Sequence, residues 1–116
     1  MLEVSAEDFE TYVDEAIGTV PEALLDLVEN CILVVEEESP EGWPDLLGLY
    51  EGIPLDQRGN SYAGALPDRI TIYRGPLLRS CATLEELREQ VRITVVHEIG
   101  HFFGIDDDRL HELGYA

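Results

Sequence analysis

The spacing of apolar residues predicts two helices near the N-terminus. Four apolar residues recur at intervals of three and four positions, which is the period of an amphipathic helix: Phe9, Val13, Ala16 and Ile17. Ser5, with Asp8 three positions later, resembles a capping box and predicts the start of this helix, and Gly18 predicts its end. Pro21 suits the first turn of a second helix that continues to Val28. We therefore expect an N-terminal helical layer.

Three short segments in the middle of the chain have the pattern of strands. Residues 31–36 are apolar and rich in β-branched side chains, as in a buried strand, and residues 46–50 predict a second strand. Residues 68–74 alternate polar and apolar positions, which predicts a half-exposed strand that ends at Gly75-Pro76. We expect this last strand to lie at an edge of the sheet, where its open backbone groups could bind an extended peptide.

The longest helix is predicted near the C-terminus. Thr83 and Glu86 form a second capping box, so this helix should begin at Leu84. Apolar residues cover a wide part of its surface, as in a helix that packs on several sides: Leu87, Val91, Val95, Val96, Ile99 and Phe102. Gly104 should end the helix in the left-handed conformation, and the acidic run 106–108 should cap a last short helix over 109–113.

This long helix carries the pattern H-E-x-x-H, formed by His97, Glu98 and His101. Residues four positions apart share one helix face, so both imidazoles can reach one tetrahedral metal ion at about 2.0–2.1 Å. Glu98 points about 100° around the helix from His97. From there its carboxylate can act as a general base on a metal-activated water. The competing interpretation is that the two histidines are ordinary core or surface residues. It is disfavoured because the pattern rarely arises by chance in so short a chain and because it lies on an apolar, well-capped helix that Gly104 ends.

A catalytic zinc ion needs a third protein ligand and one open position. Asp107 lies six residues after His101 and three after Gly104, where metzincins place their third ligand, and a carboxylate oxygen is an acceptable ligand for zinc. The sequence therefore predicts a Zn²⁺ site at His97, His101 and Asp107. Three neighbours remain alternatives for the third ligand: Asp106, Asp108 and His111. Of these, Asp108 is the residue that we expect to cap the last helix.

The charge and composition of the chain limit the kinds of molecule that it is expected to bind. The chain has 116 residues and a net charge of −18, and its first 57 residues contain 16 acidic residues and no basic one. Such a charge argues against nucleic acid and anionic membranes as partners and favours basic peptides, although it also suits a merely soluble surface. The length predicts a single domain over 1–116. The acidic N-terminus and the lack of a long apolar run predict a cytoplasmic protein, in which Cys31 and Cys81 are free thiols.

Three segments together resemble the minimal zincins, a family of small bacterial zincin-like metallopeptidases. They are residues 47–55, residues 66–77 and residues 91–114, the last of which contains the metal motif. The resemblance implies an α+β zincin-like fold, with a small mixed sheet packed against the N-terminal helices and the H-E-x-x-H helix. It also implies zinc at the three predicted ligands, with Glu98 as the base.

The function predicted on these grounds is zinc-dependent hydrolysis of peptide bonds, with peptides or unfolded proteins, basic ones included, as substrates. Tyr62, Tyr73 and Tyr115 are candidate donors to the developing oxyanion. The chain has no methionine after Met1, so the methionine turn of larger metzincins is missing and Leu113 or Tyr115 would form the floor of the site. The alternative function is a non-catalytic zinc-binding module for protein interaction. Glu98 argues against it, because a purely structural site has no use for that carboxylate.

Overall fold

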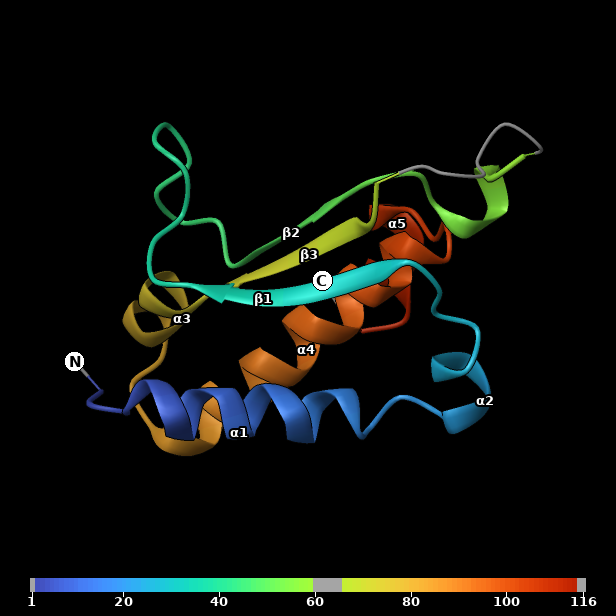
Figure 1. Cartoon of the computed structure of the whole chain (residues 1–116). Coiled ribbons are helices and arrows are strands. Elements are labelled where there is room, and N and C mark those ends of the chain that lie inside the picture. The colour runs from blue at the N-terminus through green and yellow to red at the C-terminus, as the bar shows by residue number, and fades with distance from the viewer. Residues whose placement is uncertain (1, 60–65, 115–116) are drawn as a thin grey trace.

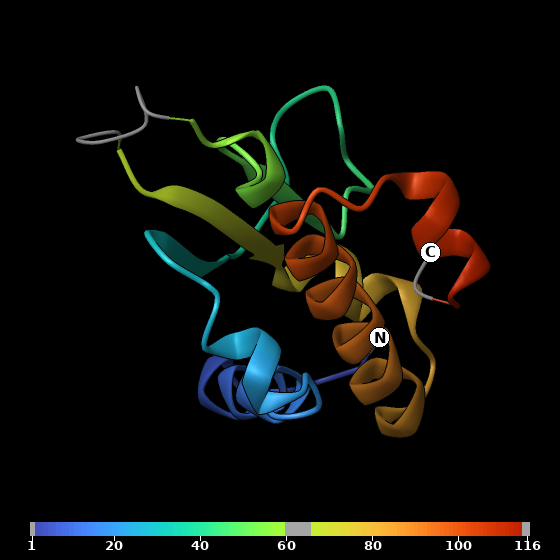
Figure 2. The ribbon, with the colours of Figure 1, turned by 90° about the vertical axis from the view of Figure 1, so that its right-hand side faces the viewer.

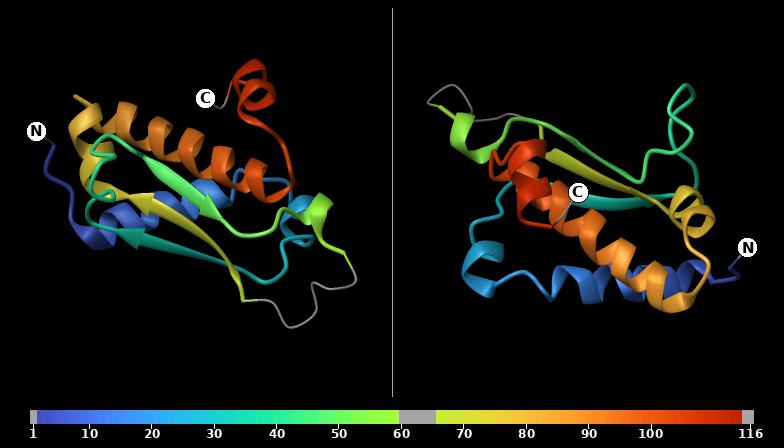
Figure 3. Two further views of the ribbon diagram at one scale, coloured as in Figure 1. Left: turned by 90° about the horizontal axis from the view of Figure 1, so that it is seen from above. Right: turned by 180° about the vertical axis from the view of Figure 1, so that it is seen from behind.

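A computed structural model of the chain describes residues 2–59 and 66–114. Its elements follow in the order α1 (Ala6–Ile17), α2 (Glu22–Leu25), β1 (Cys31–Glu36), β2 (Gly48–Glu51), the 3-10 helix η1 (Leu55–Gln57), β3 (Asp68–Tyr73), α3 (Arg74–Ser80), α4 (Leu84–Phe102) and α5 (Asp107–Glu112). The strands form one layer, and α1 and α4 lie side by side against one face of it (Figures 1 and 3). This arrangement confirms the predicted α+β class.

The sheet has the strand order β1-β3-β2. β1 runs parallel to β3, with Cys31 opposite Asp68, and β2 runs antiparallel to β3, with Gly48 opposite Ile72. The prediction that residues 68–74 form an edge strand is therefore wrong, because β3 is the central strand of the described sheet. Residues 70–73 are all buried for this reason, although their alternating pattern is typical of a half-exposed strand.

The predicted helix ends are confirmed at both long helices. The Ser5 hydroxyl accepts a hydrogen bond from the Asp8 amide at 3.0 Å, and the Thr83 hydroxyl accepts one from the Glu86 amide at 3.1 Å. Helix α4 ends at Phe102, and Gly104 follows with φ of 87°, a left-handed conformation that suits glycine. The core between the helices and the sheet is built from fully buried apolar side chains: Phe9, Ile72, Leu77, Leu87, Val91 and Val95.

Two helices differ from the prediction. Helix α2 is a single turn with no buried residue: Leu25 packs against the edge of the core, and Leu24 is exposed. Helix α3 directly continues β3 at a place where Gly75-Pro76 suggests a stop. Pro76 is compatible with α3 because it lies in the first turn, where its missing amide is not needed. Glycine is favoured there because an added Cβ would lie 2.7 Å from the backbone carbonyl oxygen of Glu37, to which the Gly75 amide donates at 2.8 Å.

The structure also describes the two cysteines and shows whether any helix could cross a membrane. Cys31 and Cys81 are both free; Cys81 is buried, and Cys31 is only partly buried. Within residues 2–59 and 66–114, no helix combines the length and the apolar character needed to cross a membrane.

Candidate metal centre

The C-terminal half of α4 presents His97 and His101 on one face, as their spacing predicts. Their Nε2 atoms lie 3.0 Å apart, and their rings meet edge to face with centroids separated by 4.7 Å. The two Nε2 atoms therefore point at a common position beside the helix.

Asp107 reaches the same position from the other side of a sharp turn. Its Oδ1 atom lies 3.1 Å from Nε2 of His97 and 3.0 Å from Nε2 of His101. The turn depends on Gly104 because its φ of 87° lies in the left-handed region, which residues with a Cβ rarely adopt. Asp107 is the first residue of α5 and is 79% exposed, so its free face is open to solvent.

The three atoms have the chemistry and spacing of a zinc site. In a tetrahedral site with bonds of about 2.0–2.1 Å, the ligand atoms lie about 3.3–3.4 Å from one another. The triangle formed here, with sides of 3.0–3.1 Å, is close to that size. Two imidazole nitrogens and one carboxylate oxygen also form a donor set that zinc accepts in catalytic sites. The residues therefore fit the metal that the sequence implies.

The tautomer of His101 is fixed by the chain that follows α4. Nδ1 of His101 lies 3.0 Å from the carbonyl oxygen of Ile105, which can only accept, so Nδ1 carries the proton and donates it. The lone pair is consequently on Nε2, the atom that faces His97 and Asp107. This is the usual arrangement of a metal-binding histidine, in which the second nitrogen is held by the protein.

The alternatives for the third ligand lie elsewhere. Of the described residues, only His97, His101 and Asp107 bring potential ligand atoms this close together, within 4.8 Å of one another. Asp106 is the N-cap of α5, where its Oδ1 accepts from the Arg109 amide at 2.9 Å. The expectation that Asp108 is this cap is therefore wrong. The cap is displaced because α5 begins two residues earlier than predicted, at Asp107 rather than at Arg109.

Glu98 lies beside the two histidines and is only 7% exposed. It faces β2 at Gly48, where an added Cβ would come within 2.8 Å of Thr94 Cγ2 and 3.2 Å of Glu98 Cγ. Glycine at this position thus lets the strand approach the helix closely. Burial raises the pKa of Glu98 above its ordinary value, while the nearby His97 and His101 act in the opposite direction.

An open cleft of about 580 Å³ lies over this group. Its walls come from β2, from the turn at η1 and from the chain between α4 and α5, and they include Leu49, Tyr50, Pro54, Gln57, Ile105 and Asp106. His97, Glu98, His101 and Asp107 all line it. A smaller, mostly apolar hollow of about 180 Å³ adjoins His97 and Glu98 and is lined by Leu46, Leu47, Ile93 and Thr94. His97 and Glu98 therefore line both hollows.

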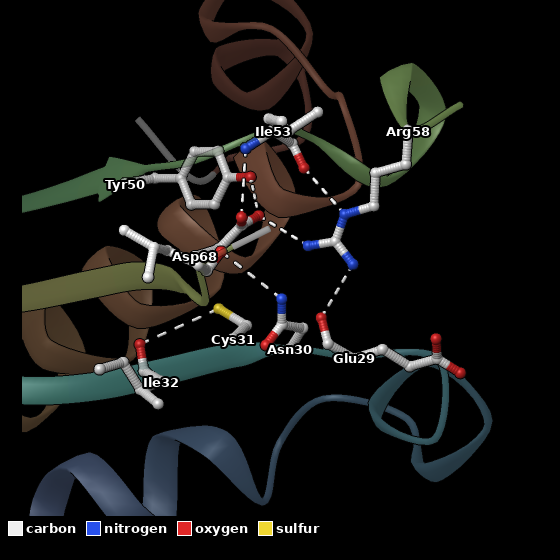
Figure 4. A network of polar contacts seen from close by, with 9 residues as sticks. Glu29, Asn30, Cys31, Ile32, Tyr50, Ile53, Arg58 and Asp68 are labelled. Carbon is white, nitrogen blue, oxygen red and sulfur yellow. Dashed lines mark hydrogen bonds and ion pairs between the residues drawn. The ribbon is translucent and has the colours of Figure 1, made fainter. Parts of the chain in front are cut away.

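A buried polar network, which no pattern in the sequence indicates, supports one wall of this cleft (Figure 4). Asp68 accepts hydrogen bonds from the Tyr50 hydroxyl, from the Ile53 amide at 3.2 Å and from the Arg58 guanidinium at 2.7 Å. Arg58 also donates to the carbonyls of Ile53 and Glu29 at 2.9 Å, and its guanidinium lies 4.7 Å from the centre of the Phe102 ring. These contacts tie β2, η1 and β3 to the end of α4.

The remaining candidates from the sequence do not reach the cleft or are not described. Tyr73 is buried in β3 and does not line the cleft, and Tyr62 and Tyr115 lie outside the described residues. Leu113, a candidate for the floor, lines a separate apolar hollow between α4 and α5. Tyr50 does line the cleft, but its hydroxyl is bonded to Asp68.

Comparisons with known proteins bear on the fold and the family of the chain. A conserved hypothetical protein (TTHA0227) from Thermus thermophilus has a similar fold, with a TM-score of 0.60 over 86% of this chain and 94% of that one, at 24% identity. No curated protein matches the chain significantly. The model of the zincin-like metallopeptidase family matches residues 28–115, from β1 through both histidines and Asp107. The chain therefore belongs to the zincin-like metallopeptidase family.

Proposed function

We propose that this protein is a zinc-dependent peptidase. One observation carries the proposal: two imidazoles and a carboxylate from opposite sides of the Gly104 turn converge at the floor of an open cleft, and the buried carboxylate of Glu98 lies beside them without joining them. A site that served only to stabilise the fold would be closed and would have no use for a second carboxylate at its side.

The residues divide the chemistry among them. His97, His101 and Asp107 would hold the zinc ion, which supplies a Lewis acid and lowers the pKa of water. Glu98 would accept the proton of the attacking water and pass it to the leaving amine. His101 is held in the required tautomer by the carbonyl of Ile105.

An extended peptide is the substrate that the cleft fits best. Among the described residues, β3 is the strand that pairs with β2, and it does so along one edge; Gly48, Leu49 and Tyr50 of β2 line the cleft. Backbone groups at the other edge are therefore available to pair with a substrate strand above Glu98. Asp106, an acidic residue outside the three candidate ligands, lines the same cleft and favours peptides with basic side chains. The acidic cleft and the net charge of the chain support short or unfolded basic peptides as substrates, and we place the reaction in the cytoplasm. The same charge argues against nucleic acid and anionic membranes as partners.

The test combines metal content with activity on the purified protein. We expect about one zinc ion per chain, and its loss in the His97→Ala/His101→Ala variant. Hydrolysis of an unfolded protein should be abolished by Glu98→Gln while the zinc content is unchanged. Stoichiometric zinc without turnover, and a protein that unfolds on chelation, would instead support the non-catalytic zinc-binding module. A chain that takes up no zinc would refute both functions.

A further inference from the structure

We propose that the outer edge of β1 binds an extended, lysine- or arginine-rich segment of another protein, which adds to the sheet as a fourth strand. The proposal concerns a surface separate from the cleft and does not depend on peptidase activity. It depends on an open strand edge, on an acidic groove beside that edge and on the internal pairing of every arginine in the chain.

β1 lies at the margin of the sheet. It pairs with β3 on one side, and no other strand of the described chain pairs with it (Figure 2). In a parallel pair, alternate residues direct both backbone groups to the partner. The carbonyl of Asn30 accepts a hydrogen bond from the Asp68 amide, so the backbone groups of Asn30 point towards β3. Every second residue after it, Ile32 and Val34, directs its backbone groups the same way. Leu33 and Val35 therefore direct their backbone groups outward, where an added strand can bond to them.

A groove of about 420 Å³ runs along this edge. Leu33, Val34 and Val35 form one side, and Glu10, Val13 and Asp14 of α1 form the other. Figure 2 shows α1 below β1, so a strand added to the edge would pass along the flank of that helix. Glu10 and Asp14 are exposed and four residues apart, so they lie on one face of α1.

The ion pairs within this chain indicate that the segment bound in the groove is positively charged. All seven arginines of the chain pair with carboxylates of the same chain other than Glu10 and Asp14. The chain contains no lysine, and its first 57 residues, which include both walls of the groove, contain no basic residue. A second copy of this chain would therefore bring carboxylates against carboxylates. A cationic segment from another protein is the complementary occupant.

The pleat of the sheet determines which positions of the bound segment should be basic. Side chains of an added strand alternate between the two faces, and those on the helix side would lie next to Glu10 and Asp14. Basic residues at every second position would meet both carboxylates. The strand itself would be held by backbone hydrogen bonds, which do not depend on sequence.

The probe is a fluorescein-labelled octapeptide that alternates lysine and threonine, measured by fluorescence anisotropy at low salt. We expect it to bind at least tenfold more tightly than the peptide with glutamate in place of lysine. A lysine-threonine peptide with a central proline should also bind more weakly, because proline removes a backbone donor. The Glu10→Lys/Asp14→Lys variant should weaken binding at least tenfold. The matched Glu41→Lys/Asp45→Lys variant, which changes net charge equally in the exposed loop between β1 and β2, should weaken it less than threefold.

Amide hydrogen exchange locates the bound peptide. Binding should slow exchange at Leu33 and Val35 and leave Ile32 and Val34 unchanged, since the latter amides already face β3. Slowed exchange at residues 48–51 instead would place the peptide in the cleft and overturn the proposal. Equal weakening by both charge variants would also overturn it, because it would show attraction to net charge alone. So would a dimer of the unbound protein in sedimentation, with Leu33 and Val35 protected by a second copy.

Discussion

The guanidinium of Arg58 lies 2.7 Å from the carboxylate of Asp68, and the two side chains are 8% and 1% exposed. Of the ion pairs in the described residues, this is the one in which both partners are buried. Breaking such a pair leaves an uncompensated charge inside the protein. We expect Arg58→Met to lower the free energy of unfolding by about 3–5 kcal/mol in urea titrations. Arg109→Met, which removes an exposed pair with Glu112, should cost about 1 kcal/mol or less.

The same contact predicts how stability depends on pH. Burial by itself would raise the pKa of Asp68, but the hydrogen bonds from Tyr50, Arg58 and the Ile53 amide outweigh it and hold that pKa below its ordinary value. Since the pKa is lower in the folded chain than in the unfolded one, Asp68 stabilises the fold fully above about pH 4, its unfolded value. This contribution is lost as the pH falls through the folded value.

The measurement is the free energy of unfolding of the metal-free protein between pH 6 and pH 2, compared with Asp68→Asn. The variant should be the less stable at pH 6, and the two curves should converge as the solution is acidified. Curves that stay parallel down to pH 2 would show that Asp68 does not carry this dependence.

Asp107 and Asp108 form a matched pair for testing the metal site. Both lie in the first turn of α5, but only Asp107 places an oxygen beside the histidines. We expect Asp107→Ala to weaken zinc binding at least tenfold in competition with a chromophoric chelator. Asp108→Ala should change it less than twofold. A loss of affinity in both variants, or in neither, would contradict the assignment of Asp107.

Gly48 allows β2 to pack closely against α4. Because a Cβ at this position would lie 2.8 Å from Thr94 Cγ2, Gly48→Ala should displace the strand and lower stability by about 1–3 kcal/mol. Under the proposed function it should also reduce kcat for peptide hydrolysis while zinc content is unchanged. Adding Thr94→Ser, which removes the crowding methyl group, should restore most of both losses. Failure of this rescue would show that the contact with Thr94 is not the cause.

Several local features of the sequence predicted the structure correctly, although the cap of α5 and the stop suggested by Gly75-Pro76 did not. The caps at Ser5 and Thr83 and the glycine turn at Gly104 were predictable because each depends on a few neighbouring residues. The spacing of His97, His101 and Asp107 likewise predicted which side chains meet, since helix α4 and one turn join all three.

Features set by distant parts of the chain were not predictable in this way. The alternation in residues 68–74 suggested an exposed edge, but β1 and β2 both pair with β3 and cover it. Arg58 and Asp68 lie on either side of a polar segment and show no common pattern in the sequence. Their contact results from the return of the chain to the sheet.

The Gly104 turn has a consequence for how metal binding and hydrolysis depend on the fold. The three candidate ligands span only residues 97–107, so the ion would close a short chelate loop at little cost in chain entropy. The cleft instead requires Gly48 and the rest of β2, from a segment about fifty residues earlier in the chain. A chain whose sheet is disordered could keep its zinc while losing the surface that orients a substrate. Zinc content would then report only on the C-terminal segment, and turnover would report on the whole fold.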